Sequence, residues 1–285
     1  MITTCILLIP AALCAQGLKV PDNCSPATGS KPGYAGYADR VIHLKTGIEM
    51  VLIAPGNFNM GETRNSFTSS SPVHRVTISR PFYIGKTEVT NSQFKKFSGT
   101  GYDGAKDVDP AYDLYVRQLR GLSIMPAGDD YPVVYVSWKN AKAFCKWSDG
   151  LDLPSEAEWE YACRAGTTTL FSFGDDDSQL SKYAWTLVNA EAFPHPVGRL
   201  LPNAWGLYDM HGNVWEWTLD DFAKYSPSTP ADGSPWIEGK MTKVLRGGSW
   251  SNSSVAYTAG CATRFNSAPG NAANNVGFRV VLRMP

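Results

Sequence analysis

The sequence has no excess of either charge, no zinc-like cysteine spacing and no heptad repeat. Its 26 Lys and Arg residues balance 26 Asp and Glu residues, so the formal net charge is zero. A neutral chain has no long-range field that attracts nucleic acid or an anionic membrane surface, and we expect neither as a partner. None of the six cysteines forms a CxxC or similar pattern, which argues against a structural zinc site. Without a heptad, nothing indicates more than a monomer.

The apolar N-terminus, residues 1–15, is too short to cross a membrane but fits the apolar core of a secretion signal. We therefore expect export. The pattern LIPAALC loosely resembles a bacterial lipidation site, which would make Cys14 a lipid anchor at the cell surface or outer membrane. Two features depart from that pattern: no Lys or Arg precedes the apolar run, and Leu13 stands where a small residue is usual. The alternative is cleavage near Ala15, which gives a periplasmic or secreted protein.

The rest of the chain divides into a lead-in over residues 16–48 and a domain over residues 49–285. The lead-in is rich in Pro, Gly, Ser and Asn without an apolar period, so we expect an irregular tether. In the domain, short runs of β-branched and aromatic residues predict strands, among them 131–138 (YPVVYVSW). Helices are predicted after Thr90, over 139–149, and after Ser155, where Glu158 completes a capping box. A Gly- and Asp-rich stretch over 100–130 indicates a surface insertion. The pattern predicts an α+β fold with few helices and much irregular structure.

Seven phrases in the domain occur in a fixed order. They are PGNFNMG, EVTN, PVVYVSW, LPSEAEWEYA, NAWGLYDMHGNVWEWT, RGGSW and VGFR. Together they resemble the formylglycine-generating enzyme (sulfatase-modifying factor) family, and the resemblance covers most of residues 49–285. It implies an elaborated C-type-lectin fold of the formylglycine-generating-enzyme type.

The family's reaction uses two nearby cysteines that follow the GGSW-like turn and bind copper. In this chain that stretch is SNSSVAY, residues 251–257, and contains no cysteine. Because soft thiolates suit Cu(I) and serine or asparagine cannot replace them, we expect no copper and no catalysis. The resemblance also implies a structural disulfide between Cys163 and Cys261. Cys145 is interpreted as a small buried hydrophobe, since Val280 occupies its family partner's place.

The phrase DMHGNVWEW corresponds to a loop that wraps calcium in the family. The resemblance assigns carboxylate ligands to Asp209 and Glu216, and backbone carbonyl ligands to Gly212 and Val214. Hard oxygen donors of this kind suit Ca²⁺. The alternative is that Asp209 and Glu216 only cap turns or pair with arginine residues.

Residues 251–275 are rich in Ser, Ala, Asn, Gly and Thr, with single Tyr, Phe and Arg residues among them. This mixture is typical of a paratope, in which small residues adapt and a few rigid side chains anchor the ligand. It also resembles the C-terminal segment of variable proteins of diversity-generating retroelements, of the Treponema variable protein type. We therefore predict Tyr257, Arg264 and Phe265 as contact anchors for a protein or other surface ligand. The surrounding contacts are predicted at Asn252, Ser254, Thr258, Thr263, Asn266, Asn271 and Asn274. A solvated loop without any partner is the alternative.

Two other hypotheses follow from the same residues. One is a metal-dependent oxidising enzyme of the family that uses His211, Asp220 or Asp221 instead of the cysteine pair. The other is a purely structural surface lipoprotein, which predicts no specific ligand and tolerance of substitutions throughout the tail.

Overall fold

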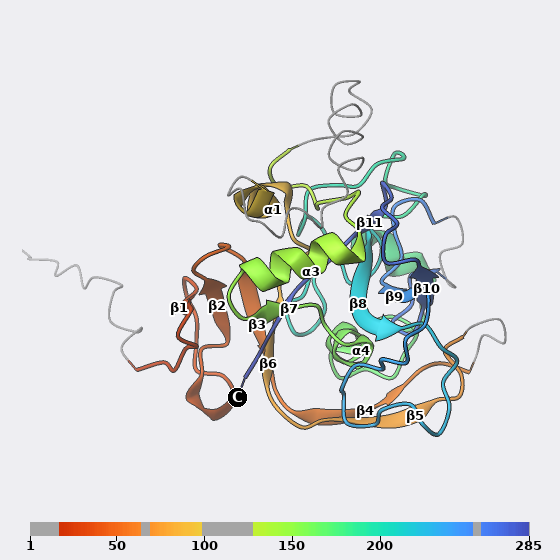
Figure 1. Cartoon of the computed structure of the whole chain (residues 1–285), viewed down its shortest axis with the longest axis horizontal. Coiled ribbons are helices and arrows are strands. Elements are labelled where there is room, and N and C mark those ends of the chain that lie inside the picture. The colour runs from red at the N-terminus through yellow and green to blue at the C-terminus, as the bar shows by residue number, and fades with distance from the viewer. Residues whose placement is uncertain (1–16, 64–68, 99–127, 253–257, 285) are drawn as a thin grey trace, which may run out of the picture.

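The structure is a computed structural model that describes residues 17–63, 69–98, 128–252 and 258–284. Its largest sheet has six strands in the order β1-β2-β3-β6-β12-β7, with antiparallel neighbours. These strands are β1 (Cys24–Pro26), β2 (Arg40–His43), β3 (Glu49–Ile53), β6 (Phe82–Gly85), β12 (Val281–Arg283) and β7 (Leu151–Asp152). Strand β12, near the C-terminus, lies between β6 and β7 and pairs with both, so one sheet joins the N-terminal and C-terminal parts of the chain (Figure 1).

Two smaller sheets complete the strand content of the described residues. The four-stranded sheet has the order β10-β9-β8-β11, and a separate hairpin pairs β4 with β5. The strands are β8 (Trp215–Asp221), β9 (Lys243–Arg246), β10 (Arg264–Ser267), β11 (Val276–Gly277), β4 (Gly56–Met60) and β5 (His74–Ile78). Strand β10 is an edge strand, so the segment predicted to bind a ligand borders this sheet.

The α-helices begin next to side chains that cap them, Thr90 for α1, Ser137 for α3 and Ser155 for α4. They are α1 (Asn91–Ser98), α3 (Trp138–Trp147), α4 (Glu156–Arg164) and the short 3-10 helices η1 (Tyr34–Gly36) and η3 (Asp177–Lys182). Ser155 and Glu158 form the predicted capping box of α4, because each side chain accepts from the backbone N–H of the other. Among the described residues, no helix combines the length and apolar character that a membrane span requires.

The main hydrophobic core lies between the two larger sheets and helices α1 and α3. Figure 1 shows α3 crossing the molecule from the six-stranded sheet towards β8. Phe144 of α3 packs with Phe97 of α1 and with Phe278, at ring-centroid distances of 6.0 and 5.5 Å. A second cluster packs the β4–β5 hairpin against α4 and includes Cys163 and Cys261. The predicted α+β class is confirmed.

Two predicted segments are corrected by the structure. Residues 16–48 are not an irregular tether throughout, because β1 and β2 from this part pair with each other and β2 pairs with β3. The segment 131–138 is not a strand: Tyr135 has a left-handed φ of 56°, and its N–H donates to the distant carbonyl of Ala273. Val133, Tyr135 and Val136 are buried, but the segment forms only one isolated bridge, between Pro132 and Thr90. The predicted insertion over 100–130 lies, up to residue 127, outside the described residues.

Candidate functional site

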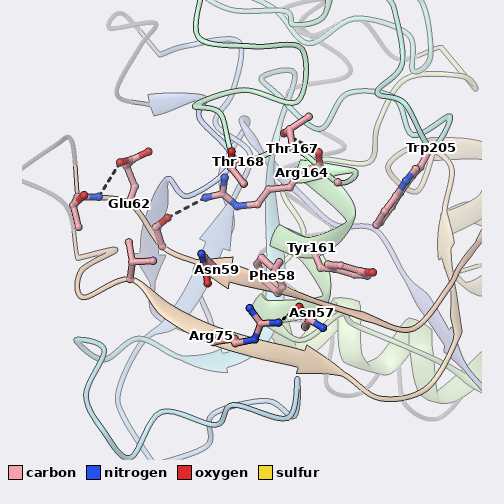
Figure 2. A pocket seen from close by; sticks show the side chains of 14 residues that line it. Asn57, Phe58, Asn59, Glu62, Arg75, Tyr161, Arg164, Thr167, Thr168 and Trp205 are labelled. Carbon is pink, nitrogen blue, oxygen red and sulfur yellow. Dashed lines mark hydrogen bonds between the residues drawn. The ribbon is translucent and has the colours of Figure 1, made fainter.

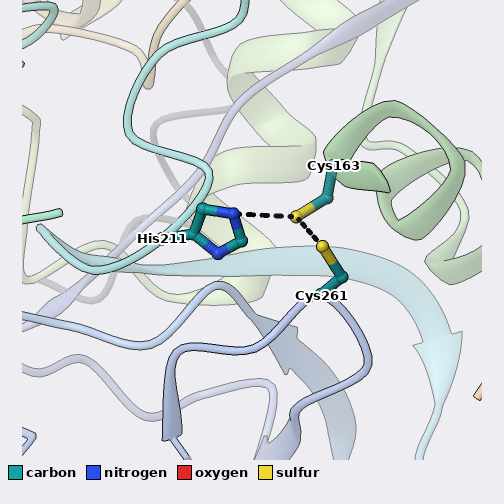
Figure 3. A group of neighbouring side chains, drawn as sticks. All are labelled: Cys163, His211 and Cys261. Carbon is teal, nitrogen blue, oxygen red and sulfur yellow. Dashed lines mark hydrogen bonds between the residues drawn. The ribbon is translucent and has the colours of Figure 1, made fainter. Parts of the chain in front are cut away.

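Cys163, His211 and Cys261 form a buried cluster beside the C-terminal segment (Figure 3). Cys163 lies in the last turn of α4, and its sulfur is 3.2 Å from the sulfur of Cys261 and 4.0 Å from Nε2 of His211. Burial alone raises the pKa of Cys261, but the Cys163 thiol and His211 together lower it to about 5. Burial raises the pKa of the Cys163 thiol, and this thiol donates to the sulfur of Cys261. The structure places the two sulfurs in contact without a covalent bond between them, and the predicted disulfide stays a prediction.

His211, a candidate for metal-dependent chemistry, is only 2% exposed. Its Nδ1 lies 2.6 Å from the carbonyl oxygen of Ala259. Because a carbonyl oxygen only accepts hydrogen bonds, Nδ1 carries a proton and donates it. Nε2 then accepts from the backbone N–H and hydroxyl of Ser172, at 3.2 and 2.9 Å. The rings of Phe171 and Phe173 cover the imidazole edge-on. His211 therefore joins three chain segments in the interior.

Asp220 and Asp221, the other catalytic candidates, are also buried. Asp220 accepts from the backbone N–H groups of Glu156 and Trp236, at 2.6 and 2.8 Å. Asp221 forms an ion pair of 2.6 Å with Lys243 and accepts three backbone N–H groups of residues 238–240. These contacts place both carboxylates in structural roles, at the start of α4 and at the end of β8.

The loop over residues 209–216 is tightly folded. Asp209, Gly212 and Asn213 have left-handed φ angles of 57°, 79° and 55°. A side chain at Gly212 would collide with the carbonyl oxygen of Trp185, so only glycine fits there. Its N–H donates to the carbonyl of Gly247 in the RGGSW turn, at 2.8 Å. The predicted calcium loop and the RGGSW turn are therefore directly connected by a hydrogen bond.

Three carboxyl groups lie around this loop, of which the sequence prediction named two. Glu216 forms a bidentate pair with Arg279, with distances of 2.6 and 2.7 Å. The arginine pairing stated as the alternative for Glu216 is thus present. Glu88, which was not predicted, accepts from the side chain of Asn213 through Oε1. Oε2 of Glu88 and Oδ1 of Asp209 are buried with no hydrogen-bond partner in the structure. Burial, the largest cause, raises the pKa of Asp209 to about 6 and that of Glu88 well above its usual value.

The two ends of segment 251–275 meet at the RGGSW turn. Nε1 of Trp250 donates to the carbonyl of Asn274 at 3.3 Å, and Nδ2 of Asn275 donates to the hydroxyl of Ser251 at 2.9 Å. Oδ1 of Asn252 accepts from the N–H and hydroxyl of Ser249, at 2.6 and 2.8 Å. The segment therefore starts and ends at this turn, and in its described part Cys261 contacts α4 and β10 pairs with β9.

Arg264 is wrongly predicted as a surface anchor. Its guanidinium is fully buried and forms a bidentate pair with Glu156 of α4, at 2.6 and 2.8 Å. It also lies 4.1 Å from the ring centroid of Tyr225. Because side chains alternate along β10, the inward direction of Arg264 turns the next residue, Phe265, outward. Composition alone suggested an exposed cation, whereas a buried carboxylate on a distant helix accounts for its position.

Phe265 is 53% exposed, and its ring stacks on that of Trp215 at a centroid distance of 5.5 Å. This exposure is compatible with a contact to a ligand, and its role as an anchor stays a prediction; Asn271 is exposed as well. The remaining predicted contacts in the described part are half-buried: Asn252, Thr258, Thr263, Asn266 and Asn274. Ser254, Tyr257 and the proposed lipid site Cys14 lie outside the described residues.

With this geometry established, comparison with known proteins identifies the family. The family model of the sulfatase-modifying factor enzyme 1-like domain matches residues 41–284. The chain belongs to this family. The match begins at β2, which agrees with the corrected start of the fold.

Relatives of this sulfatase-modifying factor domain differ in what their names say of activity. The formylglycine-generating enzyme of Mus musculus is 30% identical, over 81% of this chain and 74% of the mouse protein. The inactive C-alpha-formylglycine-generating enzyme 2 of Bos taurus is 31% identical, over 81% of this chain and 87% of the bovine protein. Among solved structures, Treponema denticola variable protein 1 has a TM-score of 0.67 and 27% identity, and the match covers 83% of this chain and 95% of that chain. The predicted elaborated C-type-lectin fold is confirmed by this likeness.

Sequence reasoning missed the ion pairs that the buried glutamates of α4 form in this sulfatase-modifying factor domain. The glutamates of α4 each pair with an arginine: Glu156 with Arg264, Glu158 with Arg283, and Glu160 with both Arg164 and Arg246. The phrase EAEWEYA held a signal for this arrangement. Alternating glutamates place charge around most of a helix that also buries Trp159, so some of them had to be buried.

Proposed function

We propose that this chain is a non-catalytic, surface-displayed protein whose segment 251–275 binds a ligand. The observation that carries the proposal is the sequence between Trp250 and Cys261, which contains no cysteine. Cys261 itself is fully buried against Cys163, so it is unable to meet a substrate in the folded protein. The copper-binding pair of the family's reaction therefore has no counterpart in this stretch.

The surroundings of the segment support a binding role. Its base is fixed by hydrogen bonds to the RGGSW turn, and its middle is fixed through Cys261 and the buried Arg264. Between these points, Phe265 and Asn271 face solvent. A rigid base with exposed aromatic and amide side chains lowers the entropy lost on binding and leaves side chains free to vary. The likeness to Treponema denticola variable protein 1 adds support for this kind of role.

Sequencing the DNA downstream of the gene tests whether the segment is diversified. We expect a near-copy of the bases that encode residues 251–275, differing mainly at adenines and followed by a reverse-transcriptase gene. Residues reachable from Asn codons are frequent in the segment, with Asn at 252, 266, 271, 274 and 275. Absence of such a copy contradicts the diversification proposal.

We also propose that the loop over 209–216 binds Ca²⁺ through Asp209, Glu216 and the carbonyls of Gly212 and Val214. Asp209 and Glu88 are two buried carboxyl groups that interact with each other, and burial favours keeping a proton on them. A cation bound between them would replace that proton and compensate their charge. Glu216 already pairs with Arg279, so its oxygens would be shared between Arg279 and Ca²⁺.

Calcium is accordingly expected to stabilise the protein. At about 100 times its Kd it should raise the unfolding midpoint by about 5 °C or more, measured by calorimetry after EDTA treatment. Asp209→Asn should abolish the shift, whereas Asp177→Asn, at an exposed carboxylate, should retain it. Identical midpoints with calcium and with EDTA contradict the site.

Surface display is proposed through lipidation of Cys14. Cells expressing the full chain and supplied with labelled palmitate should incorporate label into the parent protein. The Cys14→Ser variant should lack the label and leave the membrane fraction. An unlabelled parent protein in the soluble periplasmic or secreted fraction supports cleavage near Ala15 instead.

A second candidate function is an oxidising enzyme of the family. The observation that favours it is the group of soft donors Cys163, Cys261 and His211, all within 4.8 Å of one another. A metal there excludes the predicted disulfide, so a cross-linked Cys163–Cys261 peptide in the native protein would count against this candidate.

A further inference from the structure

A cavity of about 550 Å³ lies between the β4–β5 hairpin and the C-terminal end of α4 (Figure 2). No described residue of segment 251–275 lines it. Its size is within the range of small-molecule sites. Neither the buried cysteine cluster nor the loop over 209–216 contributes a side chain, so this cavity is a separate candidate site.

One wall of the cavity is aromatic. The Tyr161 ring lies 5.3 Å from that of Phe58 and 5.0 Å from that of Trp205, measured between ring centroids. Tyr161 is 9% exposed, and the other two rings are half-buried. Figure 2 shows the three side chains arriving from α4, β4 and the loop before residue 209. Such a wall packs against a ligand with a flat face of C–H groups.

The polar rim is on the hairpin. Asn57 and Asn59 are two residues apart in β4, so their exposed side chains lie on the same face. Arg75 of β5 is opposite Asn59 in the strand register, and its guanidinium donates to Oδ1 of Asn57. Each amide offers both donors and an acceptor, which suits a ligand with neighbouring hydroxyl groups.

The charged side chains of the cavity lining are Arg75, Arg164 and Glu62, and they differ in their partners. Glu62 accepts from the backbone N–H of Thr63, so a carboxylate of the ligand has to lie on the Arg75 side of the cavity. Arg164 forms an ion pair of 2.8 Å with Glu160 and is therefore neutralised. Arg75 is exposed, and the partner of its guanidinium on the hairpin is the neutral amide of Asn57, which leaves its charge uncompensated there. A carboxylate on the ligand is the natural partner for this guanidinium.

We propose that this cavity binds a saccharide that carries a carboxylate. The sugar ring packs on Tyr161 and Trp205, its hydroxyls bond to Asn57 and Asn59, and its carboxylate pairs with Arg75. An apolar face, adjacent hydroxyls and one negative charge occur together in uronic and related acidic sugars. This proposal is independent of the role of segment 251–275.

Calorimetric titration of the whole protein with matched pairs of oligosaccharides tests the proposal. Each pair consists of a uronic- or sialic-acid-containing sugar and its neutral counterpart. At least one acidic sugar should bind saturably, and its neutral counterpart should bind about tenfold more weakly or worse. Trp205→Ala and Arg75→Gln should each weaken binding about tenfold or more. Trp205→Phe should retain much of the affinity, which separates loss of the wall from loss of the fold.

Two controls make the result specific. Thr77→Ala changes an exposed side chain of the same hairpin outside the cavity lining, and should leave binding unchanged. Phe265→Ala should also leave it unchanged, so failure here is distinguishable from failure of the segment 251–275 proposal. The saccharide proposal is overturned if no acidic sugar binds, if neutral sugars bind equally well, or if both cavity variants bind like the parent. Binding of a proline-rich peptide to the aromatic wall, together with no binding of any sugar, also overturns it.

Discussion

Replacing Arg264 by alanine is expected to lower the free energy of unfolding by about 3–5 kcal/mol, because it leaves a buried carboxylate without its partner. Glu156 is 2% exposed and receives both of its short bonds from the Arg264 guanidinium. Arg246 is the nearest substitute, but its Nε is 3.5 Å from Glu156 and its other end already pairs with Glu160. Urea unfolding followed by tryptophan fluorescence measures the loss.

The neighbouring residue supplies the matched control. Phe265→Ala removes a larger side chain, but one that is 53% exposed, and should cost no more than about 1 kcal/mol. If Arg264→Ala is as mild as Phe265→Ala, the buried pair is not what stabilises this edge of the sheet. In that case Arg264 becomes available again as a ligand contact.

The second large effect concerns Cys163 and Cys261. If Cys163 and Cys261 are oxidised to a disulfide, reduction should lower the free energy of unfolding by about 2–5 kcal/mol, since the bond closes a long loop in the unfolded chain. The two residues are 98 positions apart, and their sulfurs meet in a fully buried site. The lowered pKa of Cys261 provides the thiolate that disulfide formation requires.

Non-reducing digestion and mass spectrometry check this pairing. A cross-linked peptide containing Cys163 and Cys261 is expected, and it should disappear after reduction. Cys145→Ser is the control, because that thiol is buried in the other core cluster and should leave the cross-link intact. Recovery of both cysteines as free thiols from protein purified without reductant contradicts the disulfide.

Features determined by nearby residues were predicted correctly from the sequence. The start of α4 depends on Ser155 and Glu158, which are three positions apart, so a local pattern is sufficient. The segment 131–138 has the apolar pattern of a strand, but its backbone partners are remote. Val133 bonds to Val89, and Tyr135 bonds to Ala273. A pattern of buried side chains does not reveal whether a neighbouring strand is present.

The same distinction separates the two anchors predicted on β10. An exposed phenylalanine and a buried arginine both reverse the usual rule that apolar side chains are buried and charged side chains are exposed. The inward position of Arg264 depends on Glu156, 108 residues earlier in the chain, and no local pattern includes that carboxylate. The family resemblance placed Asp209 and Glu216 in one loop, whereas Glu88 came from a phrase that suggested no ligand role. Long-range pairing of charges was the information that the sequence alone did not provide.

The proposed loss of catalysis is tested most directly by a turnover assay. The protein is incubated with Cu(I) and oxygen in the presence of a cysteine-containing sulfatase peptide, and formylglycine is measured by mass spectrometry. Mouse formylglycine-generating enzyme serves as the positive control, and copper without protein serves as the background. We expect product at the background level, because no cysteine lies between Trp250 and Cys261. Copper-dependent product above background that increases with protein concentration would contradict the central claim.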